Sequence, residues 1–207
     1  MKSMEEVYGP EGYKKLGWLN FLGFYQRAIG SLIRECVPLR EGSRILDAGC
    51  GYGLVSRAIE NTVKSSNLSV DLYAFDISTS MPAAYRSYVS IPAKLSCMDA
   101  CKLSYKNDYF DTIICAGLFE HIDDPEVVIS EYVRCLKPNG RLVICVSNNN
   151  IIVQSIISLF GDALGTSYTA FEPYLKRNDI VDVRRVYFKG IHFWNNLFNF
   201  AIECKIK

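Results

Sequence analysis

Apolar runs and amphipathic helical patterns alternate along the middle of this chain. Residues 20–37 repeat apolar side chains at three- and four-residue steps, which predicts a helix that Pro38 ends. Short apolar runs predict strands at 44–48, 70–76, 93–98, 110–116 and 141–147. Helical segments are predicted between them at 54–61, 79–89 and 124–136. This alternation predicts a parallel sheet with helices on both faces.

The C-terminal part of the chain departs from this alternation. Residues 180–188 and 198–206 are predicted strands, and the connection between them is so short that they must be antiparallel. Residues 151–160 are predicted to be helical. The whole pattern predicts an α/β fold in one domain covering residues 1–207, and a chain of 207 residues suffices for one such core.

Charge and cysteine content narrow the range of partners. The formal net charge is +1, so we do not expect nucleic acid as the main partner. The N-terminus lacks an apolar signal-peptide core and residues 151–160 are too short to span a bilayer, which predicts a cytoplasmic protein without a membrane span. The eight cysteines form no C-x-x-C pair, and we interpret them as small buried side chains rather than zinc ligands. The pattern carries no signal for an oligomeric state.

A glycine-rich turn, Asp47-Ala48-Gly49-Cys50-Gly51-Tyr52-Gly53, joins the first predicted strand to the next helix. Backbone N–H groups at such a helix start can approach a ligand closely where glycine leaves room. A dinucleotide fingerprint would read G-x-G-x-x-G with its acid about 20 residues later. Here the glycines are spaced by two throughout, and an acid precedes the turn. That carboxylate suits a cationic ligand such as S-adenosylmethionine, which carries an ammonium and a sulfonium.

Five segments in order resemble the class I S-adenosylmethionine-dependent methyltransferases, of the small-molecule, type 11-like kind. The glycine turn matches the first motif of that family completely. The other matching segments are 74–78, 97–100, 109–116 followed by 118–122, and 134–142. The resemblance implies a Rossmann-like seven-stranded sheet, mostly parallel with an antiparallel C-terminal strand, and S-adenosylmethionine as the cofactor.

The resemblance also implies which residues hold the cofactor at the carboxyl ends of the strands. Asp47 would face the ammonium, Asp76 the two ribose hydroxyls, and Asp99 the adenine amino group. The methionine part would lie on the glycine turn, two apolar side chains after the second strand would enclose the adenine, and two residues after the fourth would lie beneath the sulfonium. The predicted set is Asp47, Ala48, Gly49, Cys50, Gly51, Asp76, Ile77, Met81, Met98, Asp99, Ala100, Ala116 and Leu118.

His121 is the candidate general base, because it follows the fourth strand and titrates near neutral pH. The alternative is that Glu120 and His121 only orient the loop before the helix that starts near Asp124. Asp111 lies at the start of its strand, so we predict a structural role for it despite its place in a motif. We predict that His192 is a half-buried residue between the two last strands.

The acceptor site is predicted from the segments outside the shared motifs, an N-terminal helical lid at 1–40 and an acceptor-side segment at 148–180. We interpret their aromatic residues as the wall of a pocket for a partly apolar small molecule, with core packing as the alternative; they are Tyr8, Tyr13, Trp18, Phe160, Tyr168, Phe171 and Tyr174. The predicted reaction is in-line methyl transfer to an oxygen, nitrogen or carbon of that molecule.

Other functions stay open at this point. An RNA or protein methyltransferase would use the basic residues Arg177, Arg184, Arg185 and Lys189 as a patch, although a solvated strand face explains them as well. A non-catalytic subunit that binds S-adenosylmethionine is a third possibility. The glycine spacing and Asp47 disfavour an NAD-dependent dehydrogenase.

Overall fold

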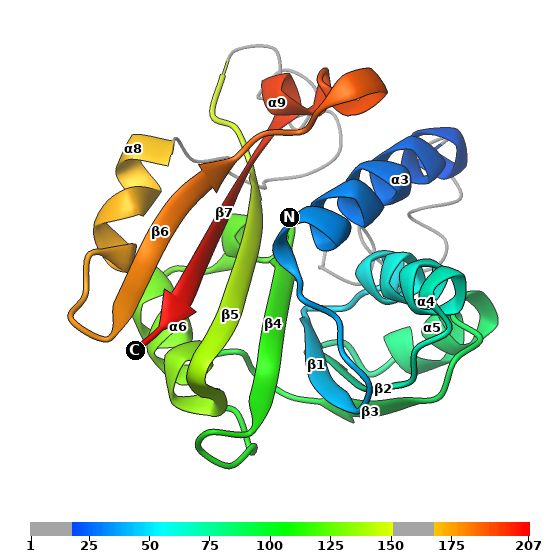
Figure 1. Cartoon of the computed structure of the whole chain (residues 1–207), viewed down its shortest axis with the longest axis horizontal. Coiled ribbons are helices and arrows are strands. Elements are labelled where there is room, and N and C mark those ends of the chain that lie inside the picture. Colours follow the sequence, from blue (N-terminus) through cyan, green and yellow to red (C-terminus); the bar gives the residue numbers. More distant parts are fainter. Residues whose placement is uncertain (1–17, 151–167) are drawn as a thin grey trace.

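The computed structural model describes residues 18–150 and 168–207, and these contain a seven-stranded sheet (Figure 1). Its strands are β1 (Ser43–Ala48), β2 (Val70–Asp76), β3 (Ala93–Cys97), β4 (Phe110–Ala116), β5 (Leu136–Ser147), β6 (Ile180–Val186) and β7 (Asn199–Ile206). The order across the sheet is β3-β2-β1-β4-β5-β7-β6. Neighbouring strands from β3 to β5 are parallel, while β7 is antiparallel to both β5 and β6. The predicted sheet is therefore confirmed.

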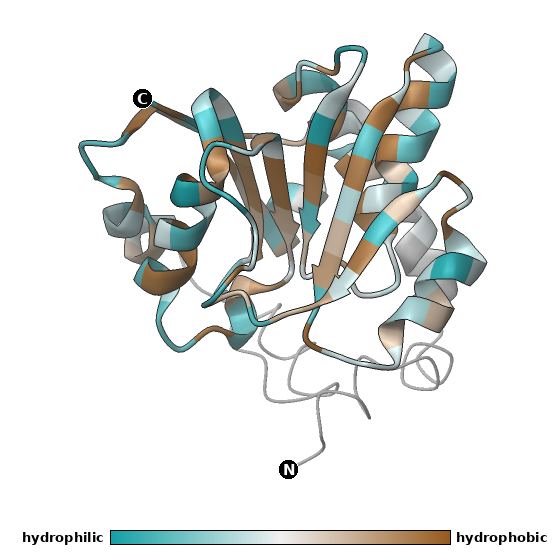
Figure 2. Ribbon diagram, turned by 90° about the horizontal axis from the view of Figure 1, so that it is seen from below, coloured by the Kyte–Doolittle hydropathy of each residue, from teal (hydrophilic) through white to brown (hydrophobic). Residues whose placement is uncertain are grey.

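Helices cover both faces of this sheet, as Figure 2 shows for its hydrophobic strands. The longer helices are α3 (Trp18–Cys36), α4 (Leu54–Ser66), α5 (Met81–Tyr88) and α6 (Pro125–Cys135). Short helical turns complete the described part, namely α8 (Tyr168–Phe171), α9 (Asn195–Phe198), η1 (Phe119–His121), η2 (Glu172–Leu175) and η3 (Gly190–His192). Helices α3 and α4 bury Ile29, Ile33 and Ile59 on one face, while α6 buries Ile129 and Tyr132 on the other.

Strand order decides where a ligand can bind. The chain goes outward from β1 to β2 and β3, then returns to the other side of β1 with β4. In an open α/β sheet, the loops that leave the carboxyl ends of β1 and β4 separate at this reversal and leave a crevice. The glycine turn follows β1, and the loop that carries His121 follows β4, so both belong to this crevice.

Local chemistry explains most element boundaries, with two corrections. Helix α6 starts as predicted, because the Asp124 side chain accepts hydrogen bonds from the backbone N–H groups of Glu126 and Val127. Helix α4 continues past the predicted end at 61 and stops where Asn67 adopts a left-handed conformation with φ 52°. Strand β5 starts before the predicted residue 141, because Leu136 already pairs with Phe110 ahead of a register shift.

Of the aromatic residues predicted to wall the acceptor pocket, Phe171 is a core residue, and Tyr168 and Tyr174 are partly buried and pack against the core. Phe171 is 2% exposed, and its ring lies 4.9 Å from that of Phe119. Tyr168 packs edge-on against Phe200, and Tyr174 packs against Phe171. Core packing is therefore the outcome for Phe171, while the pocket interpretation of Tyr168 and Tyr174 stays a prediction. Tyr8, Tyr13, Phe160, the Trp18 side chain and the helix predicted at 151–160 lie outside what the structure describes.

The cysteines follow the prediction in part. Five are buried, and Cys50 is partly buried, but Cys97 and Cys101 are exposed, so the prediction of burial is wrong for these two. Among the described residues no group of histidine, cysteine and acidic side chains could hold a metal ion. Within the same residues, no helix has the length and apolar character needed to cross a membrane.

Candidate functional site

The turn after β1 needs glycine for two different reasons. Gly49, Gly51 and Gly53 all have positive φ, at 70°, 46° and 87°. A side chain at Gly53 would lie 2.6 Å from Val89 and 2.8 Å from Tyr85, which leaves no room for a Cβ. At Gly49 an added Cβ would lie 3.1 Å from the Leu118 side chain. The sequence therefore folds here into a turn that brings bare backbone beside the residues that follow β4.

Asp47 is the buried acid of this turn, with 1% of its surface exposed. Its Oδ2 accepts hydrogen bonds from the Ser56 backbone N–H at 2.9 Å and from the Ser56 hydroxyl at 2.6 Å. Its Oδ1 is buried and has no hydrogen-bond partner in the described part of the chain. Burial raises the pKa of Asp47 to about 7, although the Ser56 hydrogen bonds oppose that shift. Such an orphaned carboxylate oxygen would be satisfied by a cationic donor.

Asp76 ties the turn after β1 to the loop after β2. Its Oδ2 accepts from the Gly51 backbone N–H at 2.9 Å, and its Oδ1 accepts from the Ser78 backbone N–H at 3.0 Å. Each carboxylate oxygen has two lone pairs, so two further donors, such as a pair of hydroxyls, can still bind. The structure therefore brings together Asp76 and Gly51, two members of the predicted cofactor set.

A small pocket lies beside Asp76. Its lining residues are Cys50, Asp76, Ser78, Met81, Pro82, Tyr85, Leu95 and Ser96. Three members of the predicted cofactor set meet there, and Tyr85 and Leu95 are apolar walls that the sequence reasoning missed. Ile77 is not part of this lining, and its side chain is 64% exposed.

Asp99 lies on the turn after β3, next to the end of β2. The backbone N–H of Met98 donates to the carbonyl oxygen of Asp76 at 3.0 Å, which joins the two strand ends. The exposed Asp99 accepts from the Cys101 backbone N–H through its Oδ1 at 2.8 Å, while Ala100 is buried. Three acids therefore stand at the ends of three adjacent strands, which is the arrangement that the sequence predicted.

The loop after β4 contributes His121 and a half-buried acid, Glu120. The Glu120 Oε1 accepts from the Ser147 backbone N–H at 2.6 Å and joins this loop to the end of β5. Its Oε2 is buried without a hydrogen-bond partner among described residues, and sequence reasoning gave it no binding role. Burial lowers the pKa of His121 although the charges of Glu120 and Asp76 oppose this, so its imidazole is neutral at pH 7. The hydrogen bond of Glu120 thus orients this loop, while the role of His121 as a general base stays a prediction.

Of the two residues predicted to be structural, Asp111 lies at the edge of the sheet opposite this crevice. Asp111, at the amino end of β4, accepts from the Arg44 backbone N–H at 2.8 Å and pairs with Lys137 at 2.6 Å. Burial alone would raise the pKa of Asp111, but these partners hold it below its ordinary value. His192 is half-buried in η3, between β6 and β7, as predicted.

Comparison with known proteins adds the decisive observation. A family model described as a methyltransferase domain matches residues 46–144, which extend from inside β1 to inside β5. Over these residues, a little under half of its length, the chain resembles a methyltransferase domain. The matched segment includes all three acids, the glycine turn and His121.

Relatives of this methyltransferase domain are similar over only part of their length. The ubiquinone biosynthesis O-methyltransferase of Xylella fastidiosa is 29% identical over 119 residues, 58% of this chain and 47% of that protein. The 27-O-demethylrifamycin SV methyltransferase of Amycolatopsis mediterranei is 30% identical over 129 residues, 61% of this chain and 46% of that protein. The chain thus spans a little under half the length of these relatives.

Solved structures share the fold. Phosphoethanolamine N-methyltransferase 2 of Haemonchus contortus, solved in complex with S-adenosyl-L-methionine, has a TM-score of 0.71 and 17% identity. The match covers 100% of this chain and 60% of that one. At this level of identity the likeness shows the fold of the methyltransferase domain and no more.

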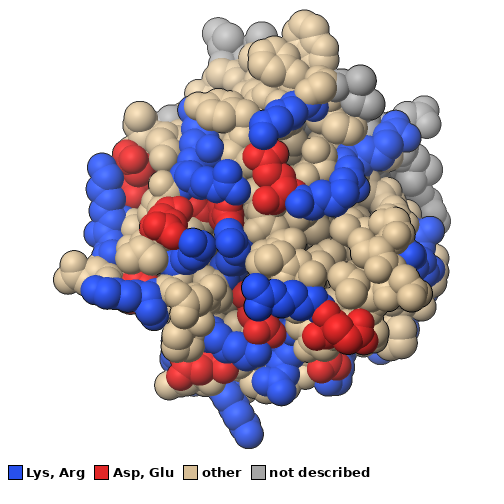
Figure 3. All heavy atoms as spheres, in the orientation of Figure 1, with Lys and Arg blue, Asp and Glu red and all other residues tan. Residues whose placement is uncertain are grey.

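The basic residues that sequence reasoning offered as a patch are each engaged. Arg177 binds Asp179 and the Ser130 hydroxyl, Arg184 pairs with the buried Glu203, and Lys189 pairs with Glu35. Arg185 stacks on the rings of Tyr168 and Tyr187 instead. In Figure 3 basic and acidic groups are interspersed over this face rather than gathered by sign. A cavity of about 350 Å³ is lined by charged residues of β5, β6 and β7 that pair with one another, namely Arg141, Asp182, Arg184, Glu203 and Lys205. We therefore do not assign this cavity to the cofactor.

Proposed function

We propose that this chain transfers the methyl group of S-adenosylmethionine to an oxygen, nitrogen or carbon of a small molecule by in-line displacement. The observation that carries the proposal is the row of acids at the carboxyl ends of β1, β2 and β3. Among them, Asp47 has a buried oxygen without a hydrogen-bond partner beside the glycine turn. A ligand with an ammonium, a ribose and an aminopurine presents donors for all three carboxylates.

Each part of the cofactor has residues that fit it. Asp47 would hold the ammonium, with the backbone of Ala48, Gly49, Cys50 and Gly51 along the methionine part. Asp76 has free lone pairs for the ribose hydroxyls, and Met81 and Met98 would contact the adenine. Asp99 would accept from the adenine amino group while the Ala100 N–H donates to a ring nitrogen. The 64% exposure of Ile77 limits it to the rim of that adenine site.

The reactive end is assigned to the loop after β4. Ala116 and Leu118 would lie beneath the sulfonium, and the Leu118 side chain, 3.1 Å from where a Cβ on Gly49 would lie, supports this placement. The cofactor supplies a methyl group already activated for displacement. The residues of this chain have to align the acceptor and exclude water. His121, neutral at pH 7, would take the proton that an oxygen or nitrogen acceptor loses.

The acceptor class rests on the relatives and on charge. Ubiquinone and 27-O-demethylrifamycin SV, which the names of two relatives contain, are small molecules. The engaged basic residues give an RNA acceptor no comparable support. We assign the acceptor side to residues 1–40 and 148–180. Within the first of these, the described helix α3 reaches the sheet through Tyr25, whose hydroxyl contacts the Cys145 thiol at 3.6 Å.

Two experiments test the proposal. Calorimetry with S-adenosylhomocysteine should show binding, whereas NADH should not bind, because the turn lacks a pyrophosphate site. A labelled-methyl transfer screen against a metabolite extract should then label a small molecule. Binding of NADH in place of S-adenosylhomocysteine would refute the proposal, and label that appears only in RNA or protein would refute the acceptor class.

A further inference from the structure

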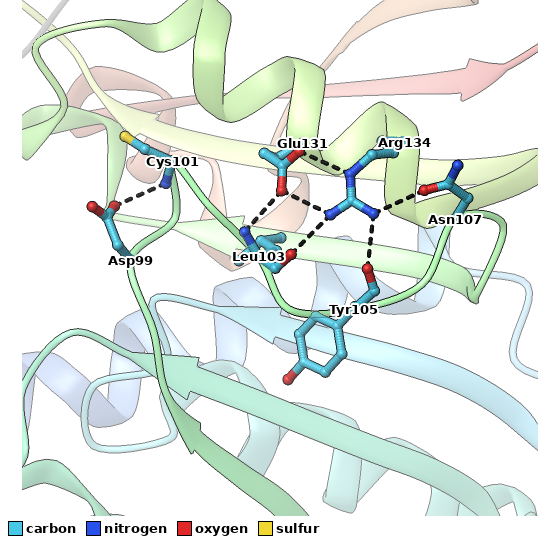
Figure 4. Close-up of polar contacts among 7 residues, drawn as sticks. All are labelled: Asp99, Cys101, Leu103, Tyr105, Asn107, Glu131 and Arg134. Carbon is cyan, nitrogen blue, oxygen red and sulfur yellow. Dashed lines mark hydrogen bonds and ion pairs between the residues drawn. The ribbon is translucent and has the colours of Figure 1, made fainter.

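The segment between β3 and β4, residues 98–109, carries Asp99 and contains no strand or helix (Figure 4). Helix α6 holds it in place. The Leu103 backbone N–H donates to Glu131 Oε2 at 2.8 Å, and the N–H groups of Asp108 and Tyr109 donate to the last carbonyls of the helix. At its other end, Met98 is bonded to Asp76. The turn of Asp99 is therefore a short span between two anchored points.

Arg134 is the centre of the second anchor, and all five of its N–H donors are used (Figure 4). Its Nε and one NH2 donor form a two-point pair with Glu131, both at 2.8 Å. The second NH2 donor bonds the Leu103 carbonyl at 2.9 Å. Both NH1 donors reach further along the loop, to the Tyr105 carbonyl at 2.8 Å and the Asn107 side chain at 2.9 Å. Lysine has only three donors on one atom, so it cannot replace this planar fork.

The position of Asp99 depends on these contacts of Glu131 and Arg134 with residues 98–109. Its Oδ1 bonds the Cys101 N–H, and its carbonyl accepts from the Lys102 N–H, so the turn ends directly before the anchored Leu103. Glu131 and Arg134 stand on α6, which follows the His121 loop, and within the described part of the chain their side-chain hydrogen bonds go to each other and to residues 98–109. They can thus act on a bound purine only through residues 98–109.

We propose that Arg134, oriented by Glu131, is a positioning residue that sets the selectivity of the site for an aminopurine over an oxopurine. This inference rests on the proposed function, because it takes Asp99 as the acceptor for the purine amino group. Without the contacts of Glu131 and Arg134 the Asp99 turn loses its anchor at Leu103. The Asp99 carboxylate then no longer meets the purine amino group in one fixed geometry. Selectivity should then fall more than overall binding does.

The test compares two ligands that differ at that amino group. S-adenosylhomocysteine and S-inosylhomocysteine are titrated by calorimetry into the wild-type chain and Arg134→Gln. We expect the wild type to prefer S-adenosylhomocysteine by about ten-fold or more, since a lost charged hydrogen bond has that effect. In Arg134→Gln the ratio should fall below about three-fold. Arg134→Lys should restore it only in part.

Arg177→Gln is the matched control. Arg177 has a similar side-chain exposure, 26% against 31%, binds Ser130 on the same helix, and forms its own two-point pair with Asp179. It makes no contact with residues 98–109, so its loss should leave the ligand ratio unchanged. An equal collapse of the ratio in Arg177→Gln would mean a general loosening of α6 and would overturn the inference.

Other results separate this inference from the proposed function. A wild-type chain that binds neither ligand refutes the proposed function itself. A wild type that binds both equally removes Asp99 as the amine acceptor, and the inference with it. A folded Arg134→Gln with the wild-type ratio overturns the inference alone. Should Arg134→Gln fail to fold by circular dichroism, Glu131→Gln is measured in the same way, with the same expected and refuting results.

Discussion

Asp47→Asn should make the protein more stable at pH 8 and a weaker binder of S-adenosylhomocysteine. In the folded chain, burial raises the pKa of Asp47 to about 7 from an ordinary value of 3.8. The folded state therefore binds a proton more tightly than the unfolded state does. Stability from this group is complete below pH 4 and is lost as the pH rises through 7. Asparagine keeps the shape and carries no charge, so it removes this loss.

The size of the stability change follows from the pKa shift of Asp47. About three pH units at about 1.4 kcal/mol each correspond to about 4 kcal/mol of stability lost by the wild type at pH 8. The amide nitrogen of asparagine would occupy the place of the partnerless Oδ1, which costs about 1–3 kcal/mol. The variant should thus gain about 1–3 kcal/mol at pH 8 and nothing at pH 5. Loss of a charged hydrogen bond to the ammonium should weaken ligand binding by about ten- to a hundred-fold.

Urea unfolding at pH 5 and pH 8 tests the expected change in stability, and calorimetry tests the expected loss of ligand affinity. Asp111→Asn is the matched control at the other edge of the sheet. There Lys137 and the Arg44 N–H outweigh burial and hold the pKa below its ordinary value, so the variant should lose a little stability at pH 8. That loss should stay below about 1 kcal/mol because the side chain is 37% exposed, and ligand binding should not change. A stability difference for Asp47→Asn that does not grow with pH, or an unchanged affinity, refutes the reasoning.

Three further variants test other parts of the site. Asp76→Ala should abolish S-adenosylhomocysteine binding by calorimetry, because it removes both the ribose acceptor and the bonds to Gly51 and Ser78; wild-type affinity would contradict the assignment. His121→Ala should lower methyl transfer about 100-fold or more with little change in ligand affinity, and the wild-type rate should fall only below pH 6.5, because the pKa of His121 is lowered. A fully active variant would leave His121 a structural residue. Gly53→Ala should cost about 2–4 kcal/mol in thermal unfolding, since the added Cβ meets Val89 at 2.6 Å and φ is positive. Gly42→Ala, with φ 71° and nothing within 4 Å, should lose only about 1 kcal/mol, so equal losses would mean that packing at Gly53 is unimportant.

Structural features that depend on residues close together in the sequence could be predicted from the sequence alone. Strands β2 and β4 match the predicted residues, because a largely apolar run is what a strand buried on both faces requires. The Asp124 cap of α6 is equally local. The row of acids at the strand ends could also be anticipated, since parallel strands bring their carboxyl ends to one edge. The cofactor roles of these acids stay predictions.

Only the tertiary structure decided which side chains meet across the sheet. Periodicity treats an aromatic residue in the core and one in a pocket alike, so it could not tell that Phe171 packs on Phe119. It also gave no sign that Ser56 would hold Asp47, or that three donors of Arg134 would anchor the loop of Asp99. Such contacts join residues that are distant along the chain and depend on how the elements pack. The sequence by itself thus determined the sheet and the glycine turn, and the packing decided the charge state of Asp47 and the anchoring of Asp99.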